Sequence, residues 1–456
     1  MDCYGGMLKF LSKEQLDKIH ESSLEVLNET GVKVEDKQAL ELFSDKGAEV
    51  EFSQEIVRLP PAMVEDAIAS APSRVILYGR DEAHHLELGG TRVYLGTGGT
   101  AVNVLDLETG EKREAVTADV ANIARLVDNL EHIDFFVVPV FPNDAGKEGA
   151  DEARFLNSLA HTSKHVMGGV YTLEGIKKVI DEAVEIAGSE KKLREKPIIS
   201  FIANIMSPLS MEKDYTVYFR HAVEKGIPVV GPPAPIAGAT SPITLPGTIV
   251  QTNAEALFTV TFSQVIDTGA KTLYSVVPTT MDMKSSEFKF GSIEMGMMNA
   301  ACAELAQYYD LPIYNTAGVS DSKTPDIKAG YEKMSGILLS ALAGANYIHD
   351  AAGLLDSGMC VAYEQYVIDN QILGIAKRVL QGLEFSEERL ALKEIKEVGP
   401  GGNFLTSDST LKYMRSEFFT DSLDDNQDWD DWLNNGAPDA RDRAREIARD
   451  ILQDEC

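Results

Sequence analysis

The chain has 456 residues, of which 44% are apolar, so it is long and apolar enough to bury a large core. Its 72 acidic and 42 basic side chains give a formal net charge of −30, which would repel phosphate backbones and argues against nucleic acid as a partner. Because no apolar run approaches membrane-spanning length, the first residues lack a secretory signal, and the cysteines (Cys3, Cys302, Cys360 and Cys456) are widely separated, we expect a cytoplasmic protein with reduced thiols and no membrane contact.

The first 92 residues predict a cap of helices and short strands. Ser12 begins the first helix, Gln15 completes a capping box with it, and Gly31 ends the helix. Further helices are expected at 37–46 and at 61–69, the latter opened by a proline pair. Residues 75–113 are then rich in β-branched residues and glycine, which indicates strands leading into the next part of the chain.

Eight apolar, strand-like runs follow, most of them separated by helical patterns. Two runs, 133–140 and 198–205, are apolar almost throughout, as parallel strands buried on both faces usually are. Their recurrence at roughly 30 to 45 residues fits repeated strand–helix–strand units, and eight such units close into a barrel with a filled interior. An open doubly wound sheet is the alternative, but the chain lacks the G-x-G-x-x-G sequence of its dinucleotide-binding form. The expected strands are 93–105, 133–140, 165–171, 198–205, 227–231, 271–277, 311–317 and 346–350.

The last part of the chain predicts a helical extension. A glycine-rich break at 399–403 ends the barrel pattern, and the acidic segment 421–432 that follows contains both tryptophans. A final helix after Pro438 has an apolar stripe, which predicts packing on the barrel or on a neighbouring subunit. This helix and the two tryptophans, which we expect to be exposed, together predict a homo-oligomer. The predicted fold is therefore α/β: a (β/α)8 TIM-type barrel over 93–398, with an N-terminal α+β cap (1–92) and a C-terminal helical extension (399–456).

Chemistry in such a barrel belongs at the carboxyl ends of its strands. The predicted strand ends are dominated by glycine, proline and serine, and only Asp321, His349 and Asp350 offer groups of the kind that bind metals or transfer protons. The pair His161-x-x-x-His165 has the spacing of helical metal ligands, but the helix is expected to end between the two residues. We therefore predict no metal site.

Several stretches of the sequence resemble the trimethylamine methyltransferase family. They are Leu24-Glu-Val-Leu-Asn-Glu-Thr-Gly-Val32, Asp321-Ser-Lys-Thr-Pro-Asp-Ile-Lys-Ala-Gly-Tyr-Glu-Lys333, Ala341-Leu-Ala-Gly-Ala-Asn-Tyr-Ile-His349, Leu355-Asp-Ser-Gly358, Tyr363-Glu-Gln365 and Gly399-Pro-Gly-Gly-Asn-Phe-Leu405. Together they extend over almost the whole chain. The resemblance implies a barrel that moves a methyl group from a methylated amine to the cobalt of a separate corrinoid protein, so that the partner supplies the corrinoid and this chain binds none tightly.

One departure from the family distinguishes its branches. Members that use trimethylamine carry pyrrolysine in the last third of the chain, whereas this chain has standard residues throughout. It therefore resembles the branch of glycine betaine:corrinoid methyltransferases, whose close relatives use proline betaine, carnitine and similar quaternary amines. The family's glycine-rich segment usually reads Gly-Pro-Gly-Gly-His, but this chain has Asn403 at the last position. The resemblance implies glycine betaine, which would be released as dimethylglycine, as the leading substrate.

The chemistry of a quaternary amine fits the scarcity of acid–base groups. Loss of a methyl group leaves a neutral tertiary amine, so neither a Lewis acid nor a general acid is required. The protein must instead hold one methyl group in line with the cobalt nucleophile in a dry pocket, where aromatic faces contribute about 0.5–2 kcal/mol each. Two other functions stay open: lyase or hydrolase chemistry in a barrel, and binding of a quaternary amine without methyl transfer.

Candidate binding residues lie in or just after the predicted strands. A substrate carboxylate would find donors in Asn204, His349 and loop N–H groups, and His349 is favoured because Asp350 could fix its tautomer. Asp321 could offset the ammonium charge or cap the next helix. No residue is assigned a catalytic role, and the corrinoid protein is expected to dock around the barrel mouth. The aromatic candidates for the ammonium group, any of which could instead pack against a helix, are Tyr94, Phe141, Tyr171, Tyr274 and Tyr347.

Overall fold

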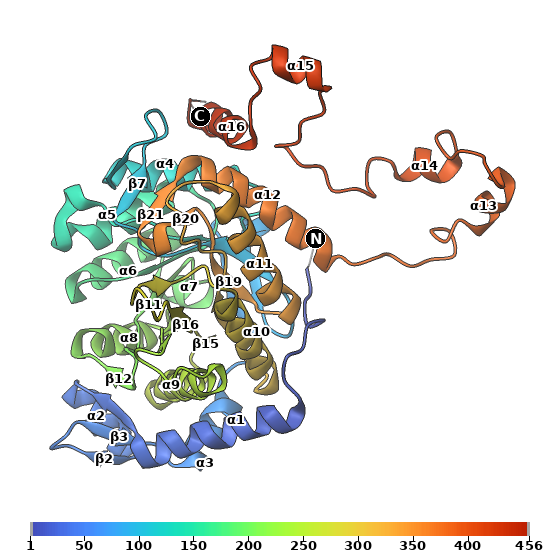
Figure 1. The fold of residues 1–456 in the computed structure, drawn as a ribbon. Helices are drawn as coiled ribbons and strands as arrows, with labels where there is room; N and C mark the ends of the chain where they lie inside the picture. The colour runs from blue at the N-terminus through green and yellow to red at the C-terminus, as the bar shows by residue number, and fades with distance from the viewer. Residues whose placement is uncertain (1–2, 454–456) are drawn as a thin grey trace.

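The N-terminal cap packs beneath a large α/β body in the computed structural model, which describes residues 3–453 (Figure 1). The predicted thiol of Cys456 therefore lies outside the described residues. Helix α1 (Lys13–Glu25) begins at Ser12 with the predicted capping box, and a π-helical turn extends it to Thr30. Helices α2 (Lys37–Asp45) and α3 (Pro61–Ser70) follow as expected.

A small sheet attaches the cap to the body. Strand β1 (Val32–Val34) pairs antiparallel with β3 (Ile56–Arg58), which pairs with β2 (Glu49–Glu51). On its other edge, β1 pairs parallel with β12 (Ser210–Met211), which follows the fourth strand of the body. The cap is therefore joined by backbone hydrogen bonds to a loop at the carboxyl end of the body's strands.

Within the described residues the body contains eight parallel strands. Seven of the predicted runs each contain one of them, and the run 346–350 overlaps the eighth, β19, which continues to Ala352. The eight strands form two four-stranded sheets, and single bridges, Gly96 with Phe135 and Val229 with Thr272, lie at the two seams. Continuous pairing therefore does not close the ring, in contrast to the closed barrel that the sequence predicts. The first sheet contains β9 (Phe136–Val137), β10 (Val166–Gly169), β11 (Ile199–Ile202) and β13 (Val229–Val230), and the second contains β15 (Tyr274–Ser275), β18 (Ile313–Thr316), β19 (Tyr347–Ala352) and β6 (Tyr94–Thr97).

The run 93–105 was predicted as one strand, and the structure divides it into two. Strand β6 ends at Thr97, and β7 (Asn103–Leu105) pairs instead with β8 (Lys112–Glu114) and β21 (Cys360–Ala362). The break falls at Gly98 and Gly99, and Gly99 has a φ of 78°. A Cβ at Gly98 would lie 2.1 Å from Oδ1 of Asp350, so only glycine allows this close approach.

Helices surround the strands in Figure 1. Helix α9 is buried on nearly all sides because it lies between the strands and the cap helices α1 and α3, and its hydrophobic positions accordingly show no one-sided stripe. No helix within residues 3–453 combines the length and apolarity needed to cross a membrane. The surrounding helices are α4 (Thr117–Asp128), α5 (Gly146–His161), α6 (Leu173–Ala187), α7 (Glu190–Glu195), α8 (Lys213–Lys225), α9 (Leu245–Ile266), α10 (Ile293–Tyr308), α11 (Ile327–Ala343) and α12 (Tyr363–Leu380).

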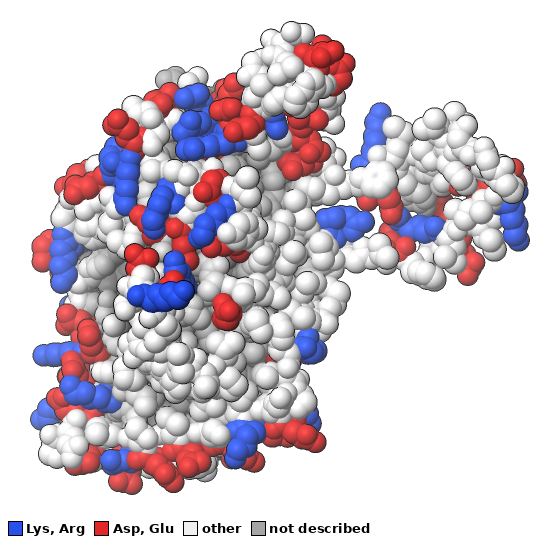
Figure 2. Space-filling model, in the orientation of Figure 1, with Lys and Arg blue, Asp and Glu red and all other residues white. Residues whose placement is uncertain are grey.

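The C-terminal part leaves the body after α12 and returns to it with α16 (Ala440–Gln453). Ala444 and Ala448 of α16 are buried against α12 and α4, so the predicted apolar stripe packs on the body of its own chain. Arg441 and Arg445 both donate to Glu364 at the start of α12. Figure 2 shows acidic and basic side chains interleaved along the upper, left and lower parts of the body, around a broad area of its lower centre that carries few charges.

Candidate functional site

A cavity of about 390 Å³ opens at the carboxyl ends of the parallel strands. Seven strand ends or the loops after them contribute to its lining, which is the arrangement expected of an active site in this class of fold. Small residues make up much of the lining and let backbone approach the cavity closely. The residues that line it are Gly99, Thr100, Gly169, Val170, Tyr171, Ile202, Asn204, Tyr215, Pro232, Ala234, Val277, Phe290, Tyr314, His349, Asp350, Leu354, Ser357 and Gly358.

The backbone of β19 turns two consecutive polar side chains toward this cavity. Successive residues of a strand normally point to opposite faces, but Asp350 has a φ of 64° and lies in an irregular stretch between Ile348 and Ala352. As a result His349 and Asp350 both line the cavity. Aspartate is among the residues that tolerate this left-handed conformation best, and such backbone irregularities concentrate at functional sites.

The polar atoms of this pair are poorly satisfied by the protein. Nδ1 of His349 lies 2.9 Å from Oδ1 of Asp350, but the two groups are not oriented for a hydrogen bond. Both ring nitrogens of His349 and Oδ1 of Asp350 are therefore buried without a hydrogen-bond partner among the described residues, while Oδ2 accepts a 2.8 Å bond from Thr316. Buried polar groups are rarely left unpaired, so these atoms are suited to meet a ligand.

Aromatic side chains form much of the remaining wall. The ring of Tyr314 stacks on His349 with centroids 4.2 Å apart and an interplanar angle of 20°. Burial raises the pKa of Tyr314 well above its usual value, so this side chain stays neutral. Tyr171, Tyr215 and Phe290 add three further rings.

The cavity lining contains few charged side chains. Asp350 is the one Asp or Glu side chain in the lining, and neither Lys nor Arg contributes to it among the residues that the structure describes. An isolated carboxylate surrounded by rings favours a cation, because the carboxylate and the negative ring faces both attract positive charge.

Buried cations outside the cavity hold its rim in place. The guanidinium of Arg154 is fully buried and donates to the carbonyl oxygens of Gly169 (2.6 Å) and Val138 (3.2 Å) and to the hydroxyl of Thr100 (3.2 Å). It therefore links the ends of three neighbouring strands.

A buried ion pair links the loops that follow the last two strands. Nζ of Lys333 lies 2.9 Å from Oδ2 of Asp369 and donates to the carbonyl of Gly318, which follows β18. The same carboxylate accepts from the N–H of Gly353, which follows β19. The pair thus fixes the two loops that flank His349 and Asp350.

The structure brings some of the predicted site residues to the cavity. His349, Asn204 and Tyr171 line it. Phe141 lies just behind the wall, with its ring edge-on to Tyr171 at 5.2 Å. Asp321 accepts from the N–H of Phe290 and from the hydroxyl of Ser357, so it supports two lining residues from outside.

The other predicted aromatics lie away from the cavity. Tyr347 is fully buried and stacks on Phe135 at 3.5 Å, deeper among the strands. Tyr274 points outward and donates to Asn253 of α9. Tyr94 is the first residue of β6, so it lies at the opposite end of the strands, where its hydroxyl accepts from the N–H of Glu87.

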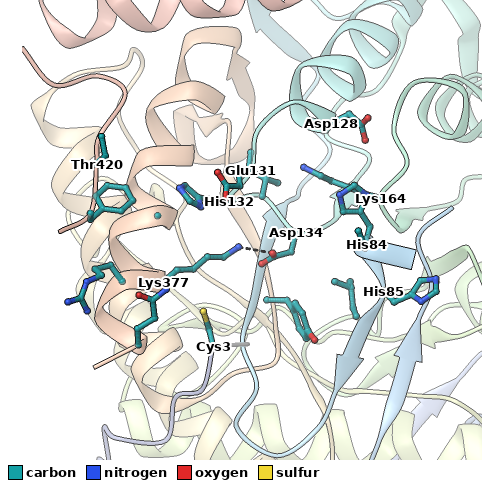
Figure 3. A pocket seen from close by; sticks show the side chains of 18 of the residues that line it. Cys3, His84, His85, Asp128, Glu131, His132, Asp134, Lys164, Lys377 and Thr420 are labelled. Atoms are coloured by element: carbon teal, nitrogen blue, oxygen red, sulfur yellow. Dashed lines mark hydrogen bonds and ion pairs between the residues drawn. The ribbon is translucent and has the colours of Figure 1, made fainter. Parts of the chain in front are cut away.

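A second cavity, of about 600 Å³, lies at that opposite end and has Tyr94 in its lining. Figure 3 shows Asp134 facing Lys377, and these two side chains form an ion pair of 2.6 Å. Lys164 donates to two carbonyl oxygens at the end of α4, and His84 is bonded to the hydroxyl of Ser163. Because these charged and polar groups are paired within the protein, we place the candidate site at the first cavity.

Sequence reasoning missed three of the aromatic lining residues. Tyr314 lies inside a predicted strand, but its direction depends on strand tilt, which a sequence does not contain. Tyr215 comes from the first turn of α8, and Phe290 from the segment between β17 (Phe288–Lys289) and α10, both outside the predicted strand ends. Tyr215 could have been found in the sequence as an aromatic residue shortly after the loop at a predicted strand end.

Eight parallel strands surrounded by helices, with a ligand-sized cavity at their carboxyl ends, define a class of α/β proteins whose active sites lie at that end. Residues 5–455 match the family described as Trimethylamine methyltransferase (MTTB). The chain belongs to this family.

Individual relatives agree with this assignment. The chain is 41% identical to the trimethylamine methyltransferase MttB of Desulfitobacterium hafniense, over 97% of this chain and 89% of the relative. It is 36% identical to MttB of Methanosarcina barkeri (98% and 91%) and 30% identical to a glycine betaine methyltransferase of Desulfitobacterium hafniense (92% and 88%). The crystal structure of the Methanosarcina barkeri monomethylamine methyltransferase MtmB has a similar fold, with a TM-score of 0.54 at 13% identity over 99% of this chain and 89% of that one.

Proposed function

We propose that this chain transfers a methyl group from a quaternary amine to the Co(I) centre of a separate corrinoid protein. The observation that carries this proposal is the cavity at the strand ends, which combines four aromatic rings with a single carboxylate. A quaternary ammonium ion is bound by such surroundings through its charge and its apolar surface together. Membership of a methyltransferase family supports the reaction type. In this proposal the eight strands act as a TIM-type barrel whose mouth faces the corrinoid protein.

The reaction needs positioning more than acid–base catalysis. The bond between nitrogen and one methyl carbon breaks, its electron pair stays on nitrogen, and the cobalt nucleophile takes the methyl group. A neutral tertiary amine leaves, so no proton has to move. The residues of this chain would hold the methyl group in line and exclude water, and the roles proposed for Tyr171, Tyr215, Phe290 and Tyr314 are those of an aromatic cradle.

The substrate that the family resemblance favours is glycine betaine, with proline betaine and carnitine as alternatives. A glycine betaine methyltransferase among the relatives supports this choice. In this scheme Asn204 and His349 would donate to the substrate carboxylate. His349 has both ring nitrogens available for such a bond.

One observation favours a second candidate, a quaternary amine without a carboxylate, such as choline or tetramethylammonium. A substrate carboxylate bound by His349 would lie close to Asp350, whose Oδ1 is 2.9 Å from the same imidazole. Two carboxylates so close repel one another, and no Lys or Arg of the described cavity lining offsets them.

A substrate panel tests both candidates. The protein is mixed anaerobically with cob(I)alamin and, in parallel, with glycine betaine, proline betaine, carnitine, choline, tetramethylammonium and trimethylamine, and methylcobalamin is followed by its absorbance. Methylation with any quaternary amine supports the proposed reaction, and the most active amine identifies the substrate. Binding of a quaternary amine without methylation, even with a corrinoid protein supplied, would replace the proposal by a binding function.

A further inference from the structure

The segment that follows α12 stands away from the rest of the molecule. Figure 1 shows α13 (Leu392–Val398) and α14 (Asp408–Tyr413) on a long excursion beyond the body, which the chain rejoins before α16. We call residues 383–415 the arm. Its two helices have seven and six residues, too few to be stable without packing against something else.

The arm carries far more apolar surface than a free segment would. Figure 2 shows broad uncharged areas on the arm between its acidic and basic side chains. Phe385 is 82% exposed and Leu383 89%, so these side chains contribute almost nothing to the fold of a single chain. The exposed large apolar residues of the arm are Leu383, Phe385, Leu390, Leu392, Ile395, Phe404, Leu405, Leu411 and Met414.

The polar contacts of the arm give it a defined shape. Arg389 pairs with Glu384 and with Glu417, Lys412 pairs with Glu388, and Ser409 donates to Glu394. These bonds connect the arm to itself and to the segment directly after it. The arm therefore keeps a fold of its own while its apolar residues stay exposed.

The arm starts from the base of the body, the end at which the strands begin. In a ring of strand–helix units the helices run back toward that end, so the C-termini of α10, α11 and α12 all lie there. Exposed apolar residues are found on this side too: Val379 near the end of α12 is 43% exposed and Tyr308 at the end of α10 is 38% exposed. Met7 (58%) and Phe10 (39%) belong to the N-terminal segment, which is bonded to the end of α11 through Leu342.

We propose that the arm docks on the base of a second copy of this chain, and that the two copies exchange arms about a two-fold axis. Both surfaces that such an interface needs, the arm and an apolar base, are present in one chain, as a self-complementary dimer requires. At roughly 100 Å² for each exposed apolar side chain, the two arms would bury on the order of 1,800 Å², above the about 1,200 Å² at which stable interfaces begin.

The geometry also explains why a second copy, and not the corrinoid protein, is the occupant. A base-to-base dimer leaves both cavities at the strand ends facing outward, where the corrinoid protein must approach to accept the methyl group. The arm leaves from the opposite end, because the last turns of α12 line the second cavity together with Tyr94 at the start of β6.

The test measures the mass of the full chain by sedimentation velocity over a range of micromolar concentrations. The arm variant combines Phe385→Ser with Leu405→Ser. The matched control combines Ile327→Ser with Tyr331→Ser, which removes two exposed large side chains (88% and 57%, against 82% and 78% in the arm variant) from α11 at the far end of the body. We expect the wild type and the control to sediment as dimers, or as larger assemblies of such dimers, and the arm variant to sediment as a monomer with an unchanged circular dichroism spectrum.

Hydrogen exchange provides a second readout that needs no variant. Amides of the arm should exchange more slowly as the wild-type concentration rises and the dimer forms. A wild type that is monomeric at these concentrations, an arm variant that keeps the wild-type assembly, or an arm protected only after a corrinoid protein is added would each overturn the proposal.

Discussion

Replacement of Asp350 by asparagine removes the one acidic side chain that the described residues contribute to the cavity lining, and it leaves the shape of the cavity intact. Asparagine tolerates the left-handed backbone at this position as well as aspartate does, and its amide oxygen can still accept from Thr316. A cation about 4–5 Å from this carboxylate gains about 3–4 kcal/mol at an effective dielectric constant of 20, part of which offsets the loss of its hydration shell. We therefore expect Asp350→Asn to weaken the binding of tetramethylammonium roughly 10- to 100-fold.

Calorimetric titration of the wild type and the variant with tetramethylammonium measures this loss directly. Choline is titrated in parallel, and its uncharged carbon isostere, 3,3-dimethylbutan-1-ol, is the control ligand. The affinity for choline should fall in the variant, and the affinity for the alcohol should not. Asp310→Asn is the control variant, because Asp310 has a similar backbone conformation (φ 54°) but lies at the end of α10, away from the cavity. Equal affinity of the wild type and Asp350→Asn for the cation would refute the assignment of Asp350 as its counter-charge.

Three further predictions concern the rings, a buried acid and the buried ion pair. Tyr314→Leu removes the ring that stacks on His349 and should weaken quaternary-amine binding about 3- to 30-fold, whereas Tyr314→Phe should keep most of it; an equal loss in both variants would contradict a role for the ring face. Burial raises the pKa of Glu255 to about 7, from about 4.3 in an unfolded chain, so the folded state holds a proton that the unfolded state has released. The stability that this proton contributes, on the order of 3 kcal/mol, is complete below about pH 4.3 and is lost as the pH rises through 7. The free energy of unfolding in urea, measured at pH 5 and pH 8, should therefore depend less on pH in Glu255→Gln than in the wild type. An equal pH dependence in the two proteins would contradict the raised pKa of Glu255. Lys333→Met leaves the Asp369 carboxylate buried without its cation and should lower the free energy of unfolding by about 3–5 kcal/mol, measured by the same urea titration; a change below about 1 kcal/mol would show that the pair does not anchor the loops.

Periodicity predicted the strands of the body because parallel strands buried on both faces must be apolar along their length. For this reason strand β9 (Phe136–Val137) lies within the predicted run 133–140. The single run 93–105 did not, because two consecutive glycines end β6 where the chain passes Asp350, and this contact joins residues far apart in the sequence. A run of apolar residues indicates that a strand is buried, but it does not indicate which distant residues that strand contacts.

The site was predicted less completely than the fold for a related reason. His349 and Asn204 line the cavity because a strand end fixes where a residue lies. Which aromatic rings face the cavity depends instead on tilt and on local irregularities. Tyr347 and Tyr314 are paired across neighbouring strands, yet Tyr314 reaches the cavity and Tyr347 stacks on Phe135.

In the proposed reaction a methyl group leaves a quaternary amine and reaches cobalt in a single transfer. The most direct measurement is a single-turnover reaction under anaerobic conditions, with a quaternary amine carrying ¹³C-labelled methyl groups and the Co(I) form of a corrinoid protein. We expect one labelled methyl group on cobalt for each molecule of tertiary amine formed, at a rate that falls in Asp350→Asn. Tertiary amine formed without labelled cobalt, or an amine that binds and is recovered unchanged, would contradict it.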